Sequence, residues 1–188
     1  MSDIYTKLGD DGSTGLLFGG RVSKGDPLID ALGTLDEAVA ALGLARASST
    51  DPALSVIILE VQRGLFVAAA DLAANPHARD HLVPGISTVT SSMVSRIEAI
   101  IDARVAEHPL QPVFVVPGAN LASAALEMGR TIVRRAERRL VICQQAGQVS
   151  GPQVLQYLNR VSDLLYVLAR WAVGGADEPI SHSGSVNS

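Results

Sequence analysis

The sequence predicts an all-α fold, an up-and-down bundle of five helices preceded by a glycine-rich N-terminal loop. Apolar residues make up 47% of the 188-residue chain, whereas aromatic residues make up only 4%. A core of Leu, Val, Ile and Ala suits closely packed helices better than sheets. Helical periodicity also extends from residue 26 to residue 175, with short interruptions that make consecutive helices antiparallel neighbours. A chain of this length is expected to form one domain.

Capping signals place each helix in turn. Asp26-Pro27 combines an N-cap with a proline at the first helical position, so the first helix is expected from there to about residue 47. The next helices are expected at about 50–76, 87–109, 117–147 and 150–175. The chain therefore divides into an N-terminal segment, residues 1–25, and the bundle, residues 26–175. Residues 176–188 are expected to be a disordered tail.

The N-terminal segment has a composition of its own. Six glycines fall between residues 9 and 25, together with Lys7, Arg21 and Lys24. We expect a loop that is ordered by itself or by a ligand, without strand or helix. Such a segment suits a polyphosphate, because glycine lets backbone N–H groups approach phosphate oxygens closely. The spacing of a Walker A loop is absent, and a mobile N-terminus is the alternative.

The fourth helix carries a dense stripe of guanidinium groups. At about 100° per residue, Arg130, Arg134 and Arg138 lie on one arc, with Glu137 beside them. The expected core face lies opposite and consists of Leu121, Ala125, Met128, Ile132 and Ala136. A guanidinium group can bind two phosphate oxygens through two parallel N–H···O bonds, so this stripe also indicates a polyphosphate ligand. A solvated basic face is the alternative.

The fifth helix repeats the arrangement with a mixed polar stripe. The stripe consists of Asn159, Asp163, Tyr166 and Arg170, and the expected core face consists of Leu158, Val161, Leu165, Leu168 and Ala172. An amide, a carboxylate, a phenol and a guanidinium on one arc indicate a fitted polar site. In the first helix, Asp36 shares an arc with apolar and small residues. A buried lone carboxylate is costly, so we expect an arginine partner from a neighbouring helix or another subunit.

Composition and charge narrow the functional classes. The net charge of −4 does not indicate nucleic acid as a partner, no apolar stretch approaches the roughly 20 residues of a membrane span, and the first residues lack a secretion signal. The single cysteine, Cys143, allows no internal disulfide and fits a reducing cytoplasm. We expect it to be a buried core thiol. His77 and His81 are expected to be a surface pair in a loop, because they lack further metal ligands.

Four motifs occur in order along the chain. The first is Thr6-Lys7-x-Gly9-Asp10-x-Gly12-x-Thr14-Gly15, followed by Arg21-Val22-Ser23-Lys24. The others are Leu35-Asp36-Glu37, the arginine-rich run 130–139, and Tyr157-Leu158-Asn159-Arg160-x-Ser162-Asp163. Together they resemble the signature of ATP:cob(I)alamin adenosyltransferases of the propanediol-utilisation type. The resemblance covers about residues 4–172.

The resemblance implies a homotrimer of five-helix bundles, with active sites where neighbouring subunits meet. It implies that ATP is held by Thr6, Lys7, Leu8, Gly9, Thr14, Gly15 and Lys24 of one subunit and by Arg134, Arg135, Glu137, Arg138 and Asn159 of its neighbour. Among these, the implied catalytic residues are Lys7, Arg134 and Glu137. The implied cobalamin contacts are Phe114 and Tyr166, and Asp36 with Arg130 is an implied ion pair across the interface. Mg²⁺ would be held among the phosphates.

The implied reaction transfers the 5′-deoxyadenosyl group of ATP to cob(I)alamin, which gives adenosylcobalamin and triphosphate. Cobalt is the nucleophile, so the protein supplies positioning and charge stabilisation. Phe114 would keep water and the lower axial base off cobalt(II), which makes it easier to reduce. A cobalamin reductase and an adenosylcobalamin-dependent mutase are implied partners. The alternatives are a non-catalytic carrier of cobalamin or ATP, and a di-metal carboxylate bundle, which lacks the paired Glu-x-x-His motifs it needs.

Overall fold

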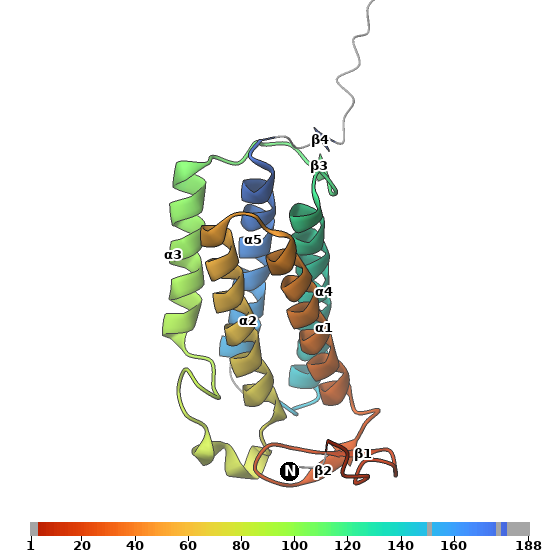
Figure 1. Ribbon diagram of the computed structural model, residues 1–188. Helices are drawn as coiled ribbons and strands as arrows, with labels where there is room; N and C mark the ends of the chain where they lie inside the picture. Colours follow the sequence, from red (N-terminus) through yellow and green to blue (C-terminus); the bar gives the residue numbers. More distant parts are fainter. Residues whose placement is uncertain (1–3, 150–151, 176–177, 180–188) are drawn as a thin grey trace, which may run out of the picture.

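The computed structural model describes residues 4–149, 152–175 and 178–179. In this part of the chain, long helices stand side by side and alternate in direction (Figure 1). They are α1 (Pro27–Ser48), α2 (Pro52–Ala73), α3 (Ser91–Glu107), α4 (Leu121–Gln145) and α5 (Gln153–Val173), and a short 3₁₀ helix, η1 (Pro76–His81), follows α2. Helix α4 packs against α1 and α5, α2 packs against α1, and α3 packs against α5. The all-α prediction is confirmed.

Side-chain caps explain why the first two helices begin where they do. Asp26 accepts a hydrogen bond from the backbone N–H of Leu28 at 2.8 Å, and Asp51 accepts one from that of Ala53 at 2.8 Å. These bonds satisfy donors that lack a partner within the first helical turn. The first helix therefore starts at the expected Asp26-Pro27 step, and the second starts at Pro52, close to the expected residue 50.

Helix α3 begins later than expected, with Thr90 as its N-cap. Ser87 and Thr88, which lie at the expected start near residue 87, form other hydrogen bonds. The hydroxyl of Ser87 accepts a hydrogen bond from the N–H of Val83 at 2.8 Å, and that of Thr88 donates to Asp71 at 2.6 Å. These hydroxyls order the connection between η1 and α3 and are thus not available to cap the helix.

The N-terminal segment contains a short hairpin, so the expectation of a loop without strands was wrong. Strand β1 (Ser13–Gly15) pairs antiparallel with β2 (Arg21–Ser23). Between them, the N–H of Leu17 donates to the carbonyl of Ala73 at 2.8 Å, and its carbonyl accepts from the N–H of Asn75 at 2.9 Å. The end of α2 thus tethers the hairpin, and composition alone does not reveal a tertiary contact of this kind.

A second strand pair lies at the opposite end of the bundle (Figure 1). Strand β3 (Val115–Val116), in the connection between α3 and α4, pairs antiparallel with β4 (Glu178–Pro179). Two residues of the expected tail therefore belong to a strand pair. The rest of that tail, residues 176–177 and 180–188, lies outside the described residues.

The core confirms the expected face of α5 and corrects that of α4. In α5, the fully buried side chains include Leu158, Val161, Leu165 and Leu168. In α4, Ala125, Ile132 and Ala136 are buried as expected, but Leu121 and Met128 are 63% and 45% exposed. The reason is the orientation of Gly129, which faces Leu42 of α1 and Leu165 of α5. The buried face of α4 is centred on the line between these two helices, and Met128 lies outside it.

Helix α2 is more apolar than the sequence expectation allowed. By length and composition it could cross a membrane, with a mean hydropathy of 1.7 over its most apolar window. In the bundle its Ile58, Val61 and Leu65 are fully buried, while Glu60 and Arg63 interrupt the apolar sequence at mid-helix. Only part of the apolar surface of α2 serves the bundle core, since Val56 and Phe66 are 66% and 57% exposed. Length and composition alone are weak evidence for a membrane span.

Helices α2 and α5 approach closely at Gly64. A Cβ atom at this position would lie 1.8 Å from the hydroxyl oxygen of Tyr157 and 2.7 Å from its ring carbon Cζ. No side chain fits in that space. The missing side chain of Gly64 therefore makes room for a buried tyrosine.

Candidate functional site

The N-terminal segment carries the first group of expected site residues, at one end of the bundle. The ammonium group of Lys24 donates a hydrogen bond to the carbonyl of Gly9 at 2.8 Å, and the guanidinium of Arg21 donates to the carbonyl of Leu8. These bonds hold the chain before β1 against β2. Of the expected ATP contacts, Thr6, Lys7, Leu8, Gly15 and Lys24 are exposed, and Gly9 and Thr14 are half-buried.

Helix α4 carries five arginines, which differ in their partners. Three are ion-paired within the chain: Arg130 with Glu127 at 2.6 Å, Arg135 with Glu37, and Arg139 with Asp30 at 2.7 Å. The other two, Arg134 and Arg138, are exposed and make no hydrogen bond or ion pair with the residues that the structure describes. Two such guanidinium groups one helical turn apart form a surface suited to a phosphate chain.

A hydrogen-bonded pair joins the polar stripes of α4 and α5. The amide nitrogen of Asn159 donates to Glu137 Oε1 at 2.9 Å, and the amide oxygen accepts from Arg160 at 2.8 Å. Arg160 is itself ion-paired with Glu98 of α3 at 2.8 Å. The structure thus brings two of the expected ATP contacts together and fixes the orientation of the amide between them.

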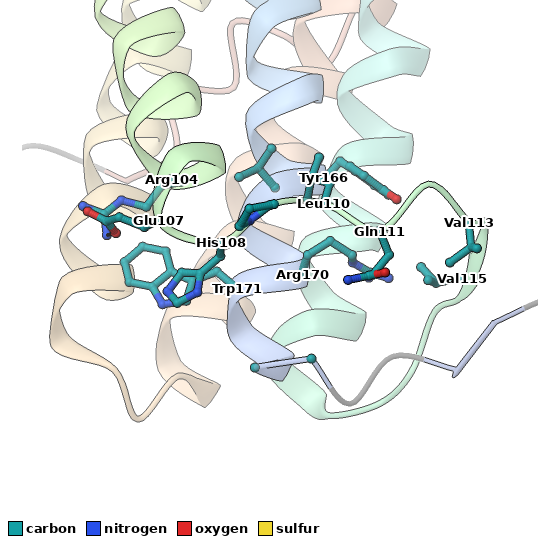
Figure 2. Close-up of a pocket in the computed structure, with 14 residues that line it drawn as sticks. Arg104, Glu107, His108, Leu110, Gln111, Val113, Val115, Tyr166, Arg170 and Trp171 are labelled. Atoms are coloured by element: carbon teal, nitrogen blue, oxygen red, sulfur yellow. Dashed lines mark hydrogen bonds and ion pairs between the residues drawn. The ribbon is translucent and has the colours of Figure 1, made fainter.

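A cavity of about 530 Å³ lies at the other end of the bundle (Figure 2). Its walls come from the ends of α3 and α5 and from the connection that leads to β3, and they include Arg104, Leu110, Val113, Val115, Tyr166, Arg170 and Trp171. The guanidinium carbon of Arg170 lies 5.3 Å from the centre of the Tyr166 ring, and that of Arg104 lies 4.5 Å from the Trp171 ring. Apolar walls with a few polar groups are typical of sites for organic ligands.

The two expected cobalamin contacts have different surroundings. Tyr166 lines the cavity, whereas Phe114 does not line it and is 84% exposed. The neighbours of Phe114 in sequence, Val113 and Val115, do line the cavity. Phe114 therefore lies at the rim, in the connection at the end of the bundle that is remote from the N-terminal segment (Figure 1). One chain does not bring Phe114 together with Lys7.

The expected burial of Asp36 does not hold within a single chain. Asp36 is exposed, as are Gly33 and Ala40 on the same face of α1. No described residue of the chain forms an ion pair with Asp36, and its expected partner Arg130 is bound to Glu127. The face of α1 that carries Asp36 is turned away from α2 and α4, so no helix of the described chain covers it.

Comparison with known proteins agrees with this architecture. A model of the family described as cobalamin adenosyltransferase matches residues 4–172. This chain belongs to that family. The motif resemblance drawn from the sequence is thereby confirmed.

Relatives within the family differ in length. The chain is 40% identical to the corrinoid adenosyltransferase PduO of Salmonella typhimurium, over 97% of this chain and 52% of that protein. It is 39% identical to the corrinoid adenosyltransferase of Bacillus subtilis, over 89% of this chain and 84% of that protein. The chain thus spans about half the length of the PduO relative and most of the length of the Bacillus one.

A solved structure in the family has the same fold. It is a variant of a PduO-type ATP:corrinoid adenosyltransferase from Lactobacillus reuteri, complexed with cobalamin and ATP, and it aligns with a TM-score of 0.84 at 29% identity. The alignment covers 97% of each chain.

Two residues in or beside the cavity of about 530 Å³ were not identified as site candidates from the sequence. Glu127 is buried and binds both Arg130 and Arg170. Its spacing of three residues before Arg130 is a usable signal for a helical ion pair. Trp171, in the cavity wall beside Arg170, is the single tryptophan of the chain.

Proposed function

We propose that this chain transfers the 5′-deoxyadenosyl group of ATP to cob(I)alamin. The main supporting observation is how the arginines of α4 are paired: of the five on this helix, only Arg134 and Arg138 lack an acidic partner among the described residues. A polyphosphate supplies the missing negative charge. Family membership and relatives whose printed names are corrinoid adenosyltransferases support the same activity.

In the proposed reaction cobalt provides the electron pair. It attacks the 5′ carbon of ATP, a cobalt–carbon bond forms, the bond from that carbon to the phosphate oxygen breaks, and triphosphate leaves with the electron pair of that bond. Lys7, Lys24, Arg134 and Arg138 neutralise the leaving anion, and fixed charges of this kind need no reorganisation during the reaction. Lys7 has a left-handed backbone conformation, with φ of 58°, and residues with such conformations cluster at functional sites.

The remaining expected contacts have supporting roles in this proposal. Glu137 and Asn159 orient the nucleotide through their mutual hydrogen bond, and Thr6, Leu8, Gly9, Thr14 and Gly15 enclose it. Arg135 is bound to Glu37 in the chain, so we assign it a place in the wall of the site. Phe114 and Tyr166 contact the corrinoid, with Phe114 shielding the lower face of cobalt.

We propose that Mg²⁺ enters with ATP. The described residues contain no cluster of three or more His, Cys, Asp or Glu that could hold a metal ion. Mg²⁺ commonly keeps waters and binds substrate phosphates with few protein ligands, which agrees with a surface whose side chains are mainly cations.

We propose a homotrimer in which each site combines the N-terminal segment of one subunit with α4 and α5 of the next. Three observations support it: the exposed carboxylate of Asp36, the distance between the two ends of the chain's bundle, and the exposed apolar side chains Leu44, Leu121 and Met128 on α1 and α4. Since cob(I)alamin is strongly reducing, we propose a cytoplasmic enzyme that receives it from a reductase and passes its product to a mutase.

The proposal is tested by anaerobic absorbance spectroscopy. Purified protein with ATP, Mg²⁺ and chemically reduced cobalamin should convert the cob(I)alamin spectrum to that of a light-sensitive alkylcobalamin, with release of one triphosphate per cobalt. Binding of both substrates without a cobalt–carbon bond would establish the carrier alternative instead.

A further inference from the structure

Glu127 is a buried carboxylate that binds two arginines, one with each oxygen. Oε2 accepts a hydrogen bond from Arg130 Nε at 2.6 Å, and Oε1 accepts one from Arg170 Nη2 at 3.1 Å. The side chains of Glu127 and Arg170 are 5% and 8% exposed. At this depth, loss of one partner leaves the other charge without compensation for its lost hydration, so the geometry of the pair is strongly constrained.

Arg170 connects this carboxylate to the cavity. Its guanidinium lies over the ring of Tyr166, and both side chains line the cavity in Figure 2. A cation over an aromatic face is attracted to it, more strongly where water is excluded. Glu127 thus holds one edge of the guanidinium, and the Tyr166 ring packs against its face.

We infer that Glu127 is a positioning residue for the corrinoid, because it fixes Arg170, and Arg170 in turn fixes the Tyr166 ring in the cavity wall. The identity of the ligand rests on the proposed function, whereas the arrangement of the three side chains does not. Glu127 itself is not among the residues that line the cavity. Its effect on the ligand passes through Arg170, which distinguishes it from an ion pair that only stabilises the bundle.

The test is substitution of Glu127 by Gln, read out by corrinoid binding. Glutamine keeps the shape but replaces one acceptor oxygen with an NH₂ group, which cannot accept from a guanidinium. We expect the Kd for cob(II)alamin to rise tenfold or more, while the Kd for ATP stays within twofold of the wild-type value. Quenching of Trp171 fluorescence reports corrinoid binding directly, because the single tryptophan lines the cavity.

A matched control and a double variant separate positioning from stability. Glu60→Gln removes the carboxylate partner of Arg96 on the surface, outside the cavity, and should leave the corrinoid Kd unchanged. Arg170→Met should weaken corrinoid binding. If Glu127 acts through Arg170, the Glu127→Gln/Arg170→Met variant should bind corrinoid no more weakly than Arg170→Met alone.

The outcomes are decisive in each case. A folded Glu127→Gln protein with wild-type corrinoid affinity overturns the inference, and so do losses that multiply in the double variant. If Glu127→Gln does not fold, the comparison of Arg170→Met with the double variant decides, since removing both members of a buried pair is better tolerated than removing one. If wild-type protein shows quenching of Trp171 fluorescence by cob(II)alamin but forms no adenosylcobalamin, the proposed transferase activity is refuted and the positioning role of Glu127 is not. Absence of quenching in the wild type refutes the positioning role, whatever the turnover.

Discussion

The amide of Asn159 on α5 donates a hydrogen bond to Glu137 on α4 at 2.9 Å. Glu137 lies on the same face of α4 as the exposed Arg134 and Arg138. Because Arg160 binds the oxygen of this amide at 2.8 Å, the amide cannot turn over without losing both bonds. The carboxylate of Glu137 is therefore presented in one orientation beside Arg134 and Arg138.

Asn159→Asp should weaken ATP binding about tenfold or more, which corresponds to about 1.4 kcal/mol. The new carboxylate has no N–H to donate to Glu137 and repels both that group and the phosphates. Isothermal titration with ATP measures the effect. Gln153→Glu, which adds a carboxylate at an exposed position in the first turn of α5, is the control and should retain wild-type affinity; equal affinities for both variants would remove Asn159 from the site.

Arg134→Ala should reduce ATP affinity and turnover in a protein that still folds. Arg134 is exposed, so no core cavity forms, and the loss of one charged contact costs about 1.5–3 kcal/mol. Equilibrium dialysis with ATP and the melting temperature are the two measurements. Arg96→Ala, an exposed arginine of α3, should change neither. Unaltered ATP affinity in folded Arg134→Ala would show that this guanidinium does not contact the nucleotide.

Phe114→Ala should leave ATP binding intact but impair turnover that starts from cob(II)alamin. The side chain is exposed at the rim of the cavity, so its loss leaves the bundle core unchanged. Turnover from prereduced cob(I)alamin should suffer less, because axial ligation matters less once cobalt is reduced. Electron paramagnetic resonance of bound cob(II)alamin gives the four-coordinate fraction, and an unchanged fraction in the variant would contradict the shielding role.

Mixed trimers should recover activity that two single variants lack. If Asp36 of one subunit meets Arg130 of another, Asp36→Ala and Arg130→Ala should each assemble poorly, since stranding a buried charge costs about 3–5 kcal/mol. Some interfaces in a mixture have both native residues. The mass by light scattering should be three times that of the 19.6 kDa chain. Verified mixed trimers without recovered activity would show that the two residues do not meet across an interface.

Stability should fall as the pH rises above about 9. Burial raises the pKa of the Cys143 thiol above its ordinary value of 9.0, and burial also raises the pKa of the Tyr157 phenol above 10.0. Above pH 9 the unfolded chain loses these protons while the folded chain keeps them, which lowers the free energy of unfolding. The contribution of the two groups to the free energy of unfolding is therefore complete below pH 9 and is lost as the pH rises above it. Guanidinium unfolding between pH 8 and 10.5 measures the slope, which Cys143→Ala should make shallower. An identical slope in wild type and variant would contradict the assignment for Cys143.

Local signals predicted most of the helix positions, because caps such as Asp26 and Asn120 act on their own first turn. The face of α4 was predicted less well, since the contact of Gly129 with Leu42 depends on how two helices approach. The hairpin was missed for a related reason, as its tether at Leu17 joins distant parts of the chain. At the candidate site, the sequence placed Glu137 and Asn159 on two helical stripes, and their contact at 2.9 Å required the packing of α4 on α5.

The close approach of Gly64 and Tyr157 makes these two positions epistatic. A methyl group at position 64 meets both the hydroxyl and the ring carbon of the tyrosine, so even phenylalanine at 157 would leave the clash with the ring. A descendant of this sequence can acquire a side chain at 64 only after position 157 has become smaller than an aromatic residue. If position 64 changed first, its new side chain would clash with the tyrosine that is still present at 157. Among diverging relatives that keep this packing, the two substitutions are thus expected to occur in one order, with the tyrosine lost first.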